Sequence, residues 1–312
     1  MSSKFKKEIT RIKDFGVSLT FWRVMSHCFK CAYSKKHKKV LKFLEDNFGD
    51  AIKEINDEVV TEGKIDKNLP VWIFWWQGLE DAPAVVKRAV NSIFLHCGKH
   101  KVIVLDKDNL KDYIKFPQYI WDKFEQGKIS ITHLSDLIRV SCLADYGGIW
   151  CDATLFAIQD FPDNLYGLSW YSVKLPYQDK HYVSENKWSV YFMACCLNNR
   201  IVKATQKLLF LYWERYDLII DYFLTDYIIM LLNQYDKEIR TLIDSVPINN
   251  QYIFWLAENL YKNFSENEIN QIKNSTFLFK CNWRIQLRGG EGKAGKESNF
   301  YHYFIGGETA DL

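Results

Sequence analysis

Asp136 and Arg139 lie in the middle of a largely apolar segment that predicts a helix over residues 132–146. At 100° per residue, Val140 and Leu143 share the face that carries both charges, so we expect the charges to be at least partly buried. A buried ion costs on the order of several kcal/mol unless it is paired or ligated. Two interpretations follow: a structural ion pair, or an arginine that binds a phosphate or carboxylate while the aspartate orients it or a ligand hydroxyl.

A second aspartate to consider, Asp152, ends the next predicted strand, which spans residues 149–151 after the turn glycines Gly147 and Gly148. In open α/β sheets, ligands bind outside the carboxyl ends of the strands, where a carboxylate can meet a metal or a sugar hydroxyl. An aspartate at a strand end can also simply form a turn. The Asp-x-x-Arg helix directly before it favours the ligand-binding interpretation.

The elements that must position these residues alternate between strands and helices. Buried strands are predicted near residues 71–78 and 101–106, with an amphipathic helix between them and short helices after them. This order predicts an α/β sheet that is at least partly parallel. The second half predicts helices over 202–216, 224–235 and 250–263, and a late strand within 275–281.

The combined pattern Ser-Asp-x-x-Arg, then Gly-Gly-x-Trp-x-Asp, resembles the sugar-binding region of glycosyltransferases with an Asp-x-Asp motif, including family 32 transferases and glucosylating clostridial toxins. It resembles the capsular polysaccharide synthesis protein family more closely. In that family Gly-Gly-Ile-Trp-x-Asp-Ala-Thr and an earlier Trp-Trp-Gln-Gly recur, and both stand in this sequence. The resemblance covers roughly residues 65–235. It implies a GT-A-like α/β fold, with a Rossmann-like nucleotide-binding sheet and added helices at the N-terminus and in the second half.

On this resemblance the chain divides into three parts. Residues 1–60 form a basic helical segment, 61–165 a nucleotide-sugar-binding core, and 166–312 the acceptor-side and C-terminal part of the same domain. The residues that would contact the nucleoside diphosphate sugar are Trp75, Trp76, Gln77, His133, Asp136, Arg139, Gly148, Trp150, Asp152 and Thr154. Among them, Trp75 or Trp76 would lie by the base or ribose, Trp150 would flank the ribose, and Asp136 and Arg139 would contact the sugar.

The motif departs from Asp-x-Asp at its second position. Asp152 matches the first aspartate, whereas Thr154 stands where the second would be. A threonine hydroxyl is a weaker ligand than a carboxylate for a hard cation. The expected cofactor is Mn²⁺ or Mg²⁺, held by Asp152, the diphosphate and a C-terminal group such as His302, with the need for metal left open by Thr154.

Two further features bear on catalysis. The glycine-rich basic loop at 288–298 carries Lys293 and Lys296, and is either a lid over the diphosphate or an ordinary surface loop. Glu297 stands where a P-loop requires Ser or Thr, which excludes that motif. Asp226 begins an apolar helix and is either a first-turn acid or, as the resemblance implies, a catalytic carboxylate that faces the acceptor or the sugar. Arg139 and Asp152 complete the implied catalytic set.

The charge is unevenly distributed along the chain. Residues 1–42 carry twelve Lys and Arg against two acids, a charge of +10, so a net charge of +3 leaves about −7 for the rest. This balance argues against nucleic acid as a partner. The basic segment is interleaved with apolar residues, which indicates either a helix on an anionic membrane surface or a helix packed on the body. No apolar stretch is long enough for a membrane span and no signal peptide is recognisable, so we expect a cytoplasmic protein on the inner membrane face.

The resemblance therefore implies an enzyme that moves a hexose from UDP-galactose or UDP-glucose to a lipid-linked oligosaccharide in capsular or exopolysaccharide synthesis, and the basic N-terminal segment fits a lipid-borne acceptor. The resemblance further implies that the anomeric configuration is retained. The alternative is a nucleotide- or sugar-binding protein of the same fold that has lost catalysis, as Thr154 would allow. The sequence argues against a dinucleotide oxidoreductase, because no G-x-G-x-x-G follows either early strand.

Overall fold

The apolar runs predicted as strands form the centre of a five-stranded sheet with the order β2-β1-β3-β6-β5. The computed structural model describes residues 3–55, 61–282, 299–300 and 303–304. The strands are β1 (Val71–Phe74), β2 (Val102–Leu105), β3 (Gly148–Cys151), β5 (Trp170–Ser172) and β6 (Phe192–Cys195). The predicted α/β class is confirmed, with a parallel-rich central sheet surrounded by helices.

The pairing directions decide where the functional residues can meet. β1 pairs in parallel with both β2 and β3, whereas β6 runs antiparallel to β3 and β5. Parallel strands end at the same edge of a sheet, so Trp75, Asp106 and Asp152 lie along one edge. This parallel β2-β1-β3 unit is the Rossmann-like half that a GT-A-like fold requires.

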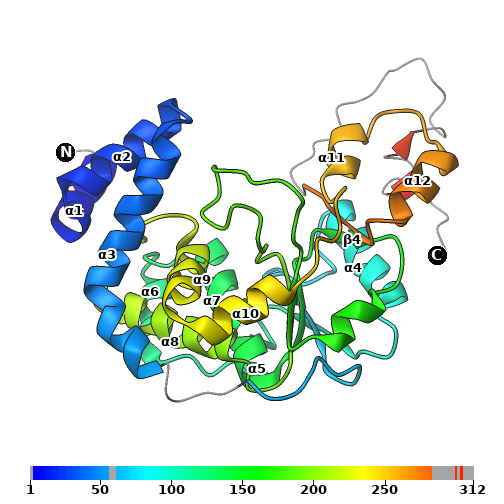
Figure 1. Cartoon of the computed structure of the whole chain (residues 1–312), viewed down its shortest axis with the longest axis horizontal. Coiled ribbons are helices and arrows are strands. Elements are labelled where there is room, and N and C mark those ends of the chain that lie inside the picture. Colours follow the sequence, from blue (N-terminus) through cyan, green and yellow to red (C-terminus); the bar gives the residue numbers. More distant parts are fainter. Residues whose placement is uncertain (1–2, 56–60, 283–298, 301–302, 305–312) are drawn as a thin grey trace.

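The helices gather on either side of this sheet (Figure 1). In the chain, α4 (Ala84–His96) lies between β1 and β2. Between β2 and β3 lie α5 (Leu110–Tyr113), α6 (Gln118–Glu125) and α7 (Ile131–Tyr146). The second half adds α8 (Arg200–Arg215), α9 (Leu224–Tyr235), α10 (Lys237–Ser245), α11 (Trp255–Asn259) and α12 (Glu266–Lys273), after the short 3₁₀ helix η1 (Asp163–Gly167). α7 packs against β1, β3 and α8, and α8 packs against α9.

The helix expected over 250–263 is mostly absent, because only α11 forms within it. Asn250 has a positive φ of 52°, which an α-helix does not allow. Its side-chain oxygen accepts hydrogen bonds from the Phe277 and Leu278 amides, and its amide group donates to the Leu278 carbonyl. These bonds tie the start of the predicted helix to a strand instead.

That strand is β7 (Leu278–Lys280), which pairs antiparallel with β4 (Leu155–Ala157) in a separate two-stranded sheet. Leu155 is the partner of Lys280 in this register. A second hydrophobic core fills the space between β4, β7, α4 and α11. The long-range pairing therefore brings residue 280 beside the segment that directly follows Asp152.

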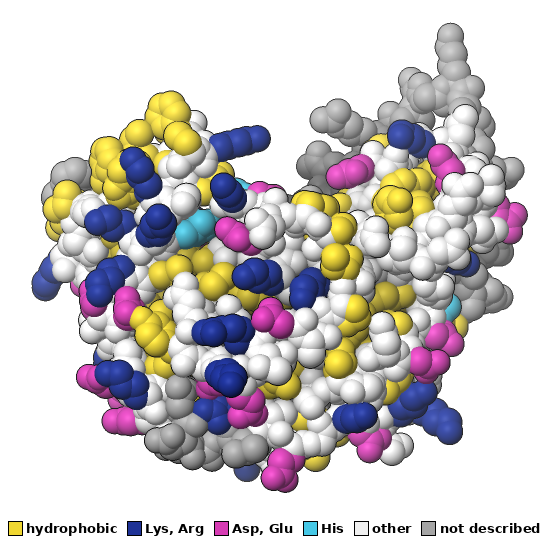
Figure 2. Space-filling view, viewed as in Figure 1, with side chains coloured by type: hydrophobic (Ala, Val, Ile, Leu, Met, Phe, Trp, Pro, Cys, Tyr) yellow, Lys and Arg dark blue, Asp and Glu magenta, His cyan; other side chains and the backbone are white. Residues whose placement is uncertain are grey.

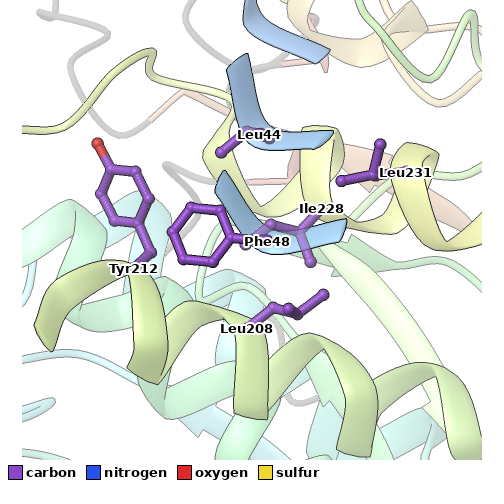
Figure 3. A pocket seen from close by; sticks show the side chains of 6 residues that line it. All are labelled: Leu44, Phe48, Leu208, Tyr212, Ile228 and Leu231. Atoms are coloured by element: carbon purple, nitrogen blue, oxygen red, sulfur yellow. The ribbon is translucent and has the colours of Figure 1, made fainter. Parts of the chain in front are cut away.

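The N-terminal segment is three helices, α1 (Ser3–Phe15), α2 (Val17–Cys28) and α3 (Ala32–Ile55), at one side of the molecule (Figure 1). α3 packs its apolar stripe onto α8 and α9. A small pocket remains in this contact, lined by Leu44, Phe48, Leu208, Tyr212, Ile228 and Leu231 (Figure 3). Its lining is almost entirely apolar, so it is a packing gap and not a site for a polar ligand.

The Gly-Gly turn between α7 and β3 has a steric cause. Gly148 has a φ of +96°, and a Cβ placed on it would lie 2.2 Å from the Pro70 carbonyl oxygen. The same oxygen accepts a 2.9 Å hydrogen bond from the Ile149 amide, which registers β3 against the start of β1. Only glycine allows this backbone approach.

Within the described residues, none of the helices combines the length and the apolar character that a bilayer crossing requires.

Candidate active site

The charges predicted to be buried on α7 form a network with Asp152. Arg139 is 5% exposed, and its Nη1 donates to Asp136 Oδ1 at 2.5 Å. Its Nη2 donates to Asp152 Oδ1 at 2.8 Å. The predicted burial of the charges and the structural ion pair are therefore both present, and the guanidinium also connects α7 to the carboxyl end of β3.

Asp152 is the centre of this network. Besides Arg139, the Trp150 indole N–H donates to its Oδ1 at 2.9 Å, and the Lys280 ammonium donates to its Oδ2 at 2.7 Å. Burial alone would raise the pKa of Asp152, but the positive charges of Lys280 and Arg139 outweigh burial and lower the pKa to about 2. The carboxylate is thus ionised throughout the neutral range, while its pairing raises the pKa of Arg139 despite burial.

Lys280 is the contact that the sequence did not predict. Its Nζ lies 2.7 Å from Asp152 Oδ2 and 2.9 Å from Thr154 Oγ1, so it bridges the two matched positions of the Asp-x-Asp motif. The Tyr191 ring lies beneath it, with Nζ 5.3 Å from the ring centroid. A turn closed by the Leu155 amide on the Asp152 carbonyl presents both motif side chains to the lysine.

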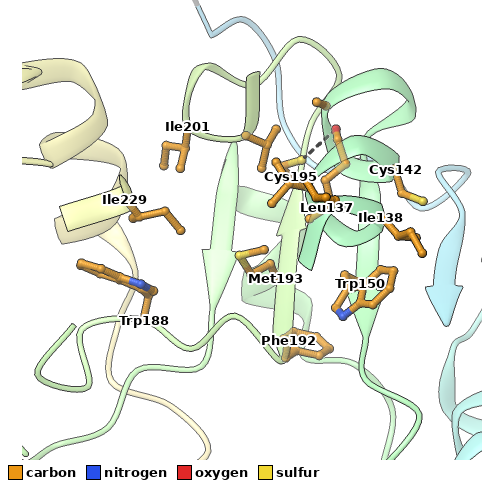
Figure 4. Close-up of a cluster of buried hydrophobic side chains, with 14 of the residues drawn as sticks. Leu137, Ile138, Cys142, Trp150, Trp188, Phe192, Met193, Cys195, Ile201 and Ile229 are labelled. Carbon is orange, nitrogen blue, oxygen red and sulfur yellow. Dashed lines mark hydrogen bonds between the residues drawn. The ribbon is translucent and has the colours of Figure 1, made fainter. Parts of the chain in front are cut away.

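Trp150 holds the network from within the core. It is 1% exposed, and the Arg139 guanidinium lies over its ring at 5.2 Å from the centroid. Figure 4 shows it packed among buried side chains of α7 and β6, including Ile138 and Met193. The enclosed ring supports Arg139 and Asp152 from the core, and its contact with a ribose stays a prediction.

Asp226 supplies a second carboxylate with different chemistry. It lies in the first turn of α9, and its Oδ1 accepts a 2.9 Å hydrogen bond from the Trp188 indole N–H. Burial raises its pKa, the nearby negative charge of Asp136 raises it further, and the pKa reaches about 7. Asp152 and Asp226, which both interact with Arg139, thus have pKa values shifted in opposite directions, a pattern typical of acid and base roles in catalysis.

His133, in the first turn of α7, lies at the edge of the network next to Asp136. Its Nδ1 lies 3.7 Å from Asp136 Oδ2, and its ring contacts those of Trp213 and Tyr222. Tyr222 is 62% exposed and immediately precedes the Asp226 helix, so it offers an accessible aromatic ring beside both carboxylates. Planar rings with an exposed face suit sugars as well as bases.

The Trp-Trp-Gln run follows β1 at the same sheet edge. Trp75 and Trp76 are half-buried and Gln77 is exposed. The Trp76 ring packs edge-on against Phe124 of α6 at 5.2 Å between centroids. Both tryptophans lie at the sheet edge that carries Asp152, because β1 and β3 are parallel. Their contact with a base or ribose stays a prediction.

One predicted binding residue, Gly148, lies apart from the others. Gly148 is buried at the amino end of β3, opposite the end that carries Asp152, and its free side is filled by Pro70. The structure assigns it a role in the turn, and its contact with the donor stays a prediction. Lys293, Lys296 and His302 lie outside the described residues, so the lid and the His302 metal ligand stay predictions.

Comparison with known proteins identifies the family of this chain. A family model described as "Capsular polysaccharide synthesis protein" matches residues 24–303. The chain belongs to this family. The match extends the resemblance seen between residues 65 and 235 to most of the chain, including α2, α3 and the strand that carries Lys280.

Two individual proteins are also similar to this family member. The "O-glycosyltransferase braB" of Annulohypoxylon truncatum is 31% identical over 107 residues, which cover 31% of this chain and 25% of that protein. The chain thus matches about a quarter of that relative's length. A solved structure entitled "PaToxG Glycosyltransferase" is similar with 14% identity and a TM-score of 0.39, over 66% of this chain and 83% of the other.

The donor set around Asp152 in this family member does not fit a divalent cation. Mg²⁺ takes six oxygen ligands, usually one or two carboxylates together with waters and substrate phosphates, so it needs at least one carboxylate oxygen that is not already engaged. Here both Asp152 oxygens already accept hydrogen bonds from cations, and Thr154 contributes a neutral hydroxyl that accepts from Lys280. Across the described residues, no cluster of three His, Cys, Asp or Glu side chains could hold a metal ion.

Sequence reasoning missed Lys280, Trp188 and Tyr222. A signal for Lys280 was present, because it ends a run in which Phe277, Leu278 and Phe279 are apolar and the alternation puts it on the face of Leu278. A lysine on a buried strand face calls for a partner. Nothing in the sequence identified that partner, which lies 128 residues away.

Proposed function

We propose that this protein is a glycosyltransferase that takes its sugar from a nucleoside diphosphate donor. The observation that carries the proposal is the Asp152 network: a carboxylate of pKa about 2, held by Arg139 and Lys280 at the carboxyl end of a parallel strand. Ligands of open α/β sheets bind at that edge. Family membership and the relative named an O-glycosyltransferase support the reaction class.

The chemistry assigns a task to each part of the site. The bond between the anomeric carbon and the diphosphate oxygen breaks, and its electron pair stays on that oxygen. An acceptor hydroxyl forms the new bond to the anomeric carbon from the face that the diphosphate leaves, as retention requires, and its proton passes to the Asp226 carboxylate. A group with a pKa of about 7 is suited to accept such a proton at neutral pH. The cations beside Asp152 offset the negative charge that builds on the diphosphate.

The finer identity of the substrates rests on the resemblance to the family. It favours UDP-galactose or UDP-glucose as donor, a lipid-linked oligosaccharide as acceptor, and retention of the anomeric configuration. The exposed ring of Tyr222 and the edge that carries Trp75 and Trp76 suit a sugar and a base respectively. Retention is tested by the anomeric coupling constant of the product.

The deciding experiment is donor turnover. We expect the purified chain to hydrolyse, or to transfer from, one member of a panel of UDP-galactose, UDP-glucose, UDP-N-acetyl sugars and GDP-mannose. Release of nucleoside diphosphate is the readout. Binding of a donor without any turnover would favour the alternative, a sugar- or nucleotide-binding protein that has lost catalysis. Absence of both binding and turnover for the whole panel would contradict the proposal.

We further propose that the α1–α2 face docks on an anionic membrane surface, where a lipid-linked acceptor would be found. Val17, Phe21 and Val24 recur at helical spacing on α2 and are each more than half exposed, at 69%, 52% and 52%. Ile9 and Ile12 of α1 are also exposed. Figure 2 shows hydrophobic side chains gathered over these helices beside Lys and Arg side chains.

Phe21→Glu combined with Val24→Glu is expected to lower co-sedimentation with phosphatidylglycerol-containing vesicles at least about tenfold, because two apolar anchors become charged. Ile248→Glu changes a side chain of the same exposure, 52%, elsewhere on the surface and serves as the control. Raising the salt concentration should weaken wild-type binding through screening of the lysines. Equal sedimentation of the double variant and wild type would contradict this role for α2.

A further inference from the structure

We propose that the Lys280 ammonium takes the place of the divalent cation in this transferase and binds the diphosphate of the donor. This inference rests on the proposed function and assigns the residue that performs one part of it. Lys280 is the group that bridges the two matched positions of the Asp-x-Asp motif, at 2.7 Å from Asp152 and 2.9 Å from Thr154. A metal ion shared by two such side chains would lie in the same space.

The lysine is held so that it can accept a ligand. An ammonium has three N–H donors, and two of them point to Asp152 Oδ2 and Thr154 Oγ1. The third can donate to a diphosphate oxygen. The Lys280 side chain is 23% exposed, whereas that of Arg139 is 6% exposed, so a ligand reaches the lysine more readily than the arginine.

The local charges favour one added anion over one added cation. The ionised pairs Asp136 with Arg139 and Asp152 with Lys280 balance each other. A dication next to Asp152 would displace Lys280 or lie against its ammonium, and like charges at that distance repel. A diphosphate instead meets a cation that is already in position, which is the preorganisation that stabilises a leaving group.

The substitution of the second motif aspartate fits the same arrangement. Thr154 is 8% exposed, and its hydroxyl accepts a hydrogen bond from Lys280 without adding a charge. A second carboxylate at this position would attract the lysine more strongly and leave a net negative charge beside the diphosphate. Thr154 and Lys280 therefore act together as a replacement for an aspartate and a metal.

The step that Lys280 assists is the departure of the diphosphate. The bond from the anomeric carbon to the diphosphate oxygen breaks, and the electron pair remains on that oxygen. The third N–H of the ammonium then donates to the diphosphate as its charge increases. No proton leaves the lysine, and the acceptor proton still passes to Asp226.

The test compares donor turnover in EDTA and in Mn²⁺ for the full chain and three variants. We expect wild type to retain its rate in EDTA. Lys280→Met, which keeps the length and removes the charge, is expected to lower kcat about 100-fold or more. Lys174→Met alters another partly buried lysine, bonded to the Val246 carbonyl, and is expected to keep the wild-type rate.

The third variant tests directly whether Thr154 and Lys280 replace an aspartate and a metal ion. Thr154→Asp combined with Lys280→Ala restores two carboxylates and removes the ammonium, so we expect Mn²⁺ to raise its activity at least about tenfold over EDTA. Loss of wild-type activity in EDTA, or an unchanged rate for Lys280→Met, would overturn the inference while leaving the transferase proposal in place. Failure of wild type to turn over any donor, with or without Mn²⁺, would overturn both.

Discussion

Asp152→Asn is expected to lower kcat/KM for donor turnover by about 1000-fold. The change keeps the shape of the side chain but removes the charge that holds Arg139 and Lys280, the two cations at the diphosphate end of the site. Removal of a single preorganised group from such a site typically costs 100- to 1000-fold in rate, on the order of 3 to 4 kcal/mol. Asp152 positions two cations at once, so we expect the upper end of that range.

The same substitution is also expected to lower the stability of the folded protein. A carboxylate with a folded pKa of about 2 and an ordinary value of 3.8 contributes about 2 to 3 kcal/mol of stability at neutral pH. Because its folded pKa is lowered, this contribution is present above pH 4 and is lost as the pH falls toward 2. The variant should therefore show a lower melting temperature at pH 7 and a smaller difference from wild type near pH 2.

Steady-state donor turnover and thermal unfolding of the same preparations separate the two effects. Asp160→Asn is the matched control, because that aspartate pairs with His96 on the surface with its side chain 79% exposed. We expect it to match wild type in both measurements. A folded Asp152→Asn variant with wild-type turnover would contradict the assignment of the site.

Asp226→Asn is expected to lose about 1000-fold in activity and yet to be more stable than wild type at pH 8. The amide still accepts the hydrogen bond from Trp188 but cannot take a proton from the acceptor hydroxyl, a role worth 100- to 10,000-fold. In wild type, kcat/KM should rise as the pH increases through about 7, because the base must be ionised. The variant should lack this rise.

The stability gain follows from the raised pKa. The folded state holds the Asp226 proton up to about pH 7, whereas the unfolded chain releases it near 3.8. Wild type therefore loses stability between about pH 4 and pH 7, by at most about 4 kcal/mol, and stays at that lower level above pH 7. Asparagine removes this loss, so its advantage is near zero at pH 4 and full at pH 8.

Thermal unfolding at pH 5 and pH 8 distinguishes this role from that of a first-turn acid. A carboxylate that only interacts favourably with the helix end would stabilise α9, and its removal would cost a few tenths of a kcal/mol up to about 1 kcal/mol. Glu268→Gln in the first turn of α12 provides that comparison, since Glu268 is exposed. If Asp226→Asn were less stable than wild type at pH 8, the first-turn interpretation would stand and the proposed base would be wrong.

The amino-acid sequence determined the local part of this protein. The apolar run before Trp75, the charged pair Asp136 and Arg139 on α7, and the Gly-Gly turn before β3 are each encoded within a few residues. Their periodicity or steric requirement can be read without knowing what packs against them. The burial of Arg139 and the order of the first strands followed from those patterns and are confirmed.

The tertiary structure decided which residues meet. Lys280 reaches Asp152 only because β7 pairs with β4, and Trp188 reaches Asp226 because a loop before β6 lies against α9. No local pattern in the sequence predicts either contact, because each depends on strand register and on packing between segments far apart in the chain. The pKa values of the two aspartates differ for the same reason: identical side chains acquire opposite shifts from neighbours that only the fold brings within reach.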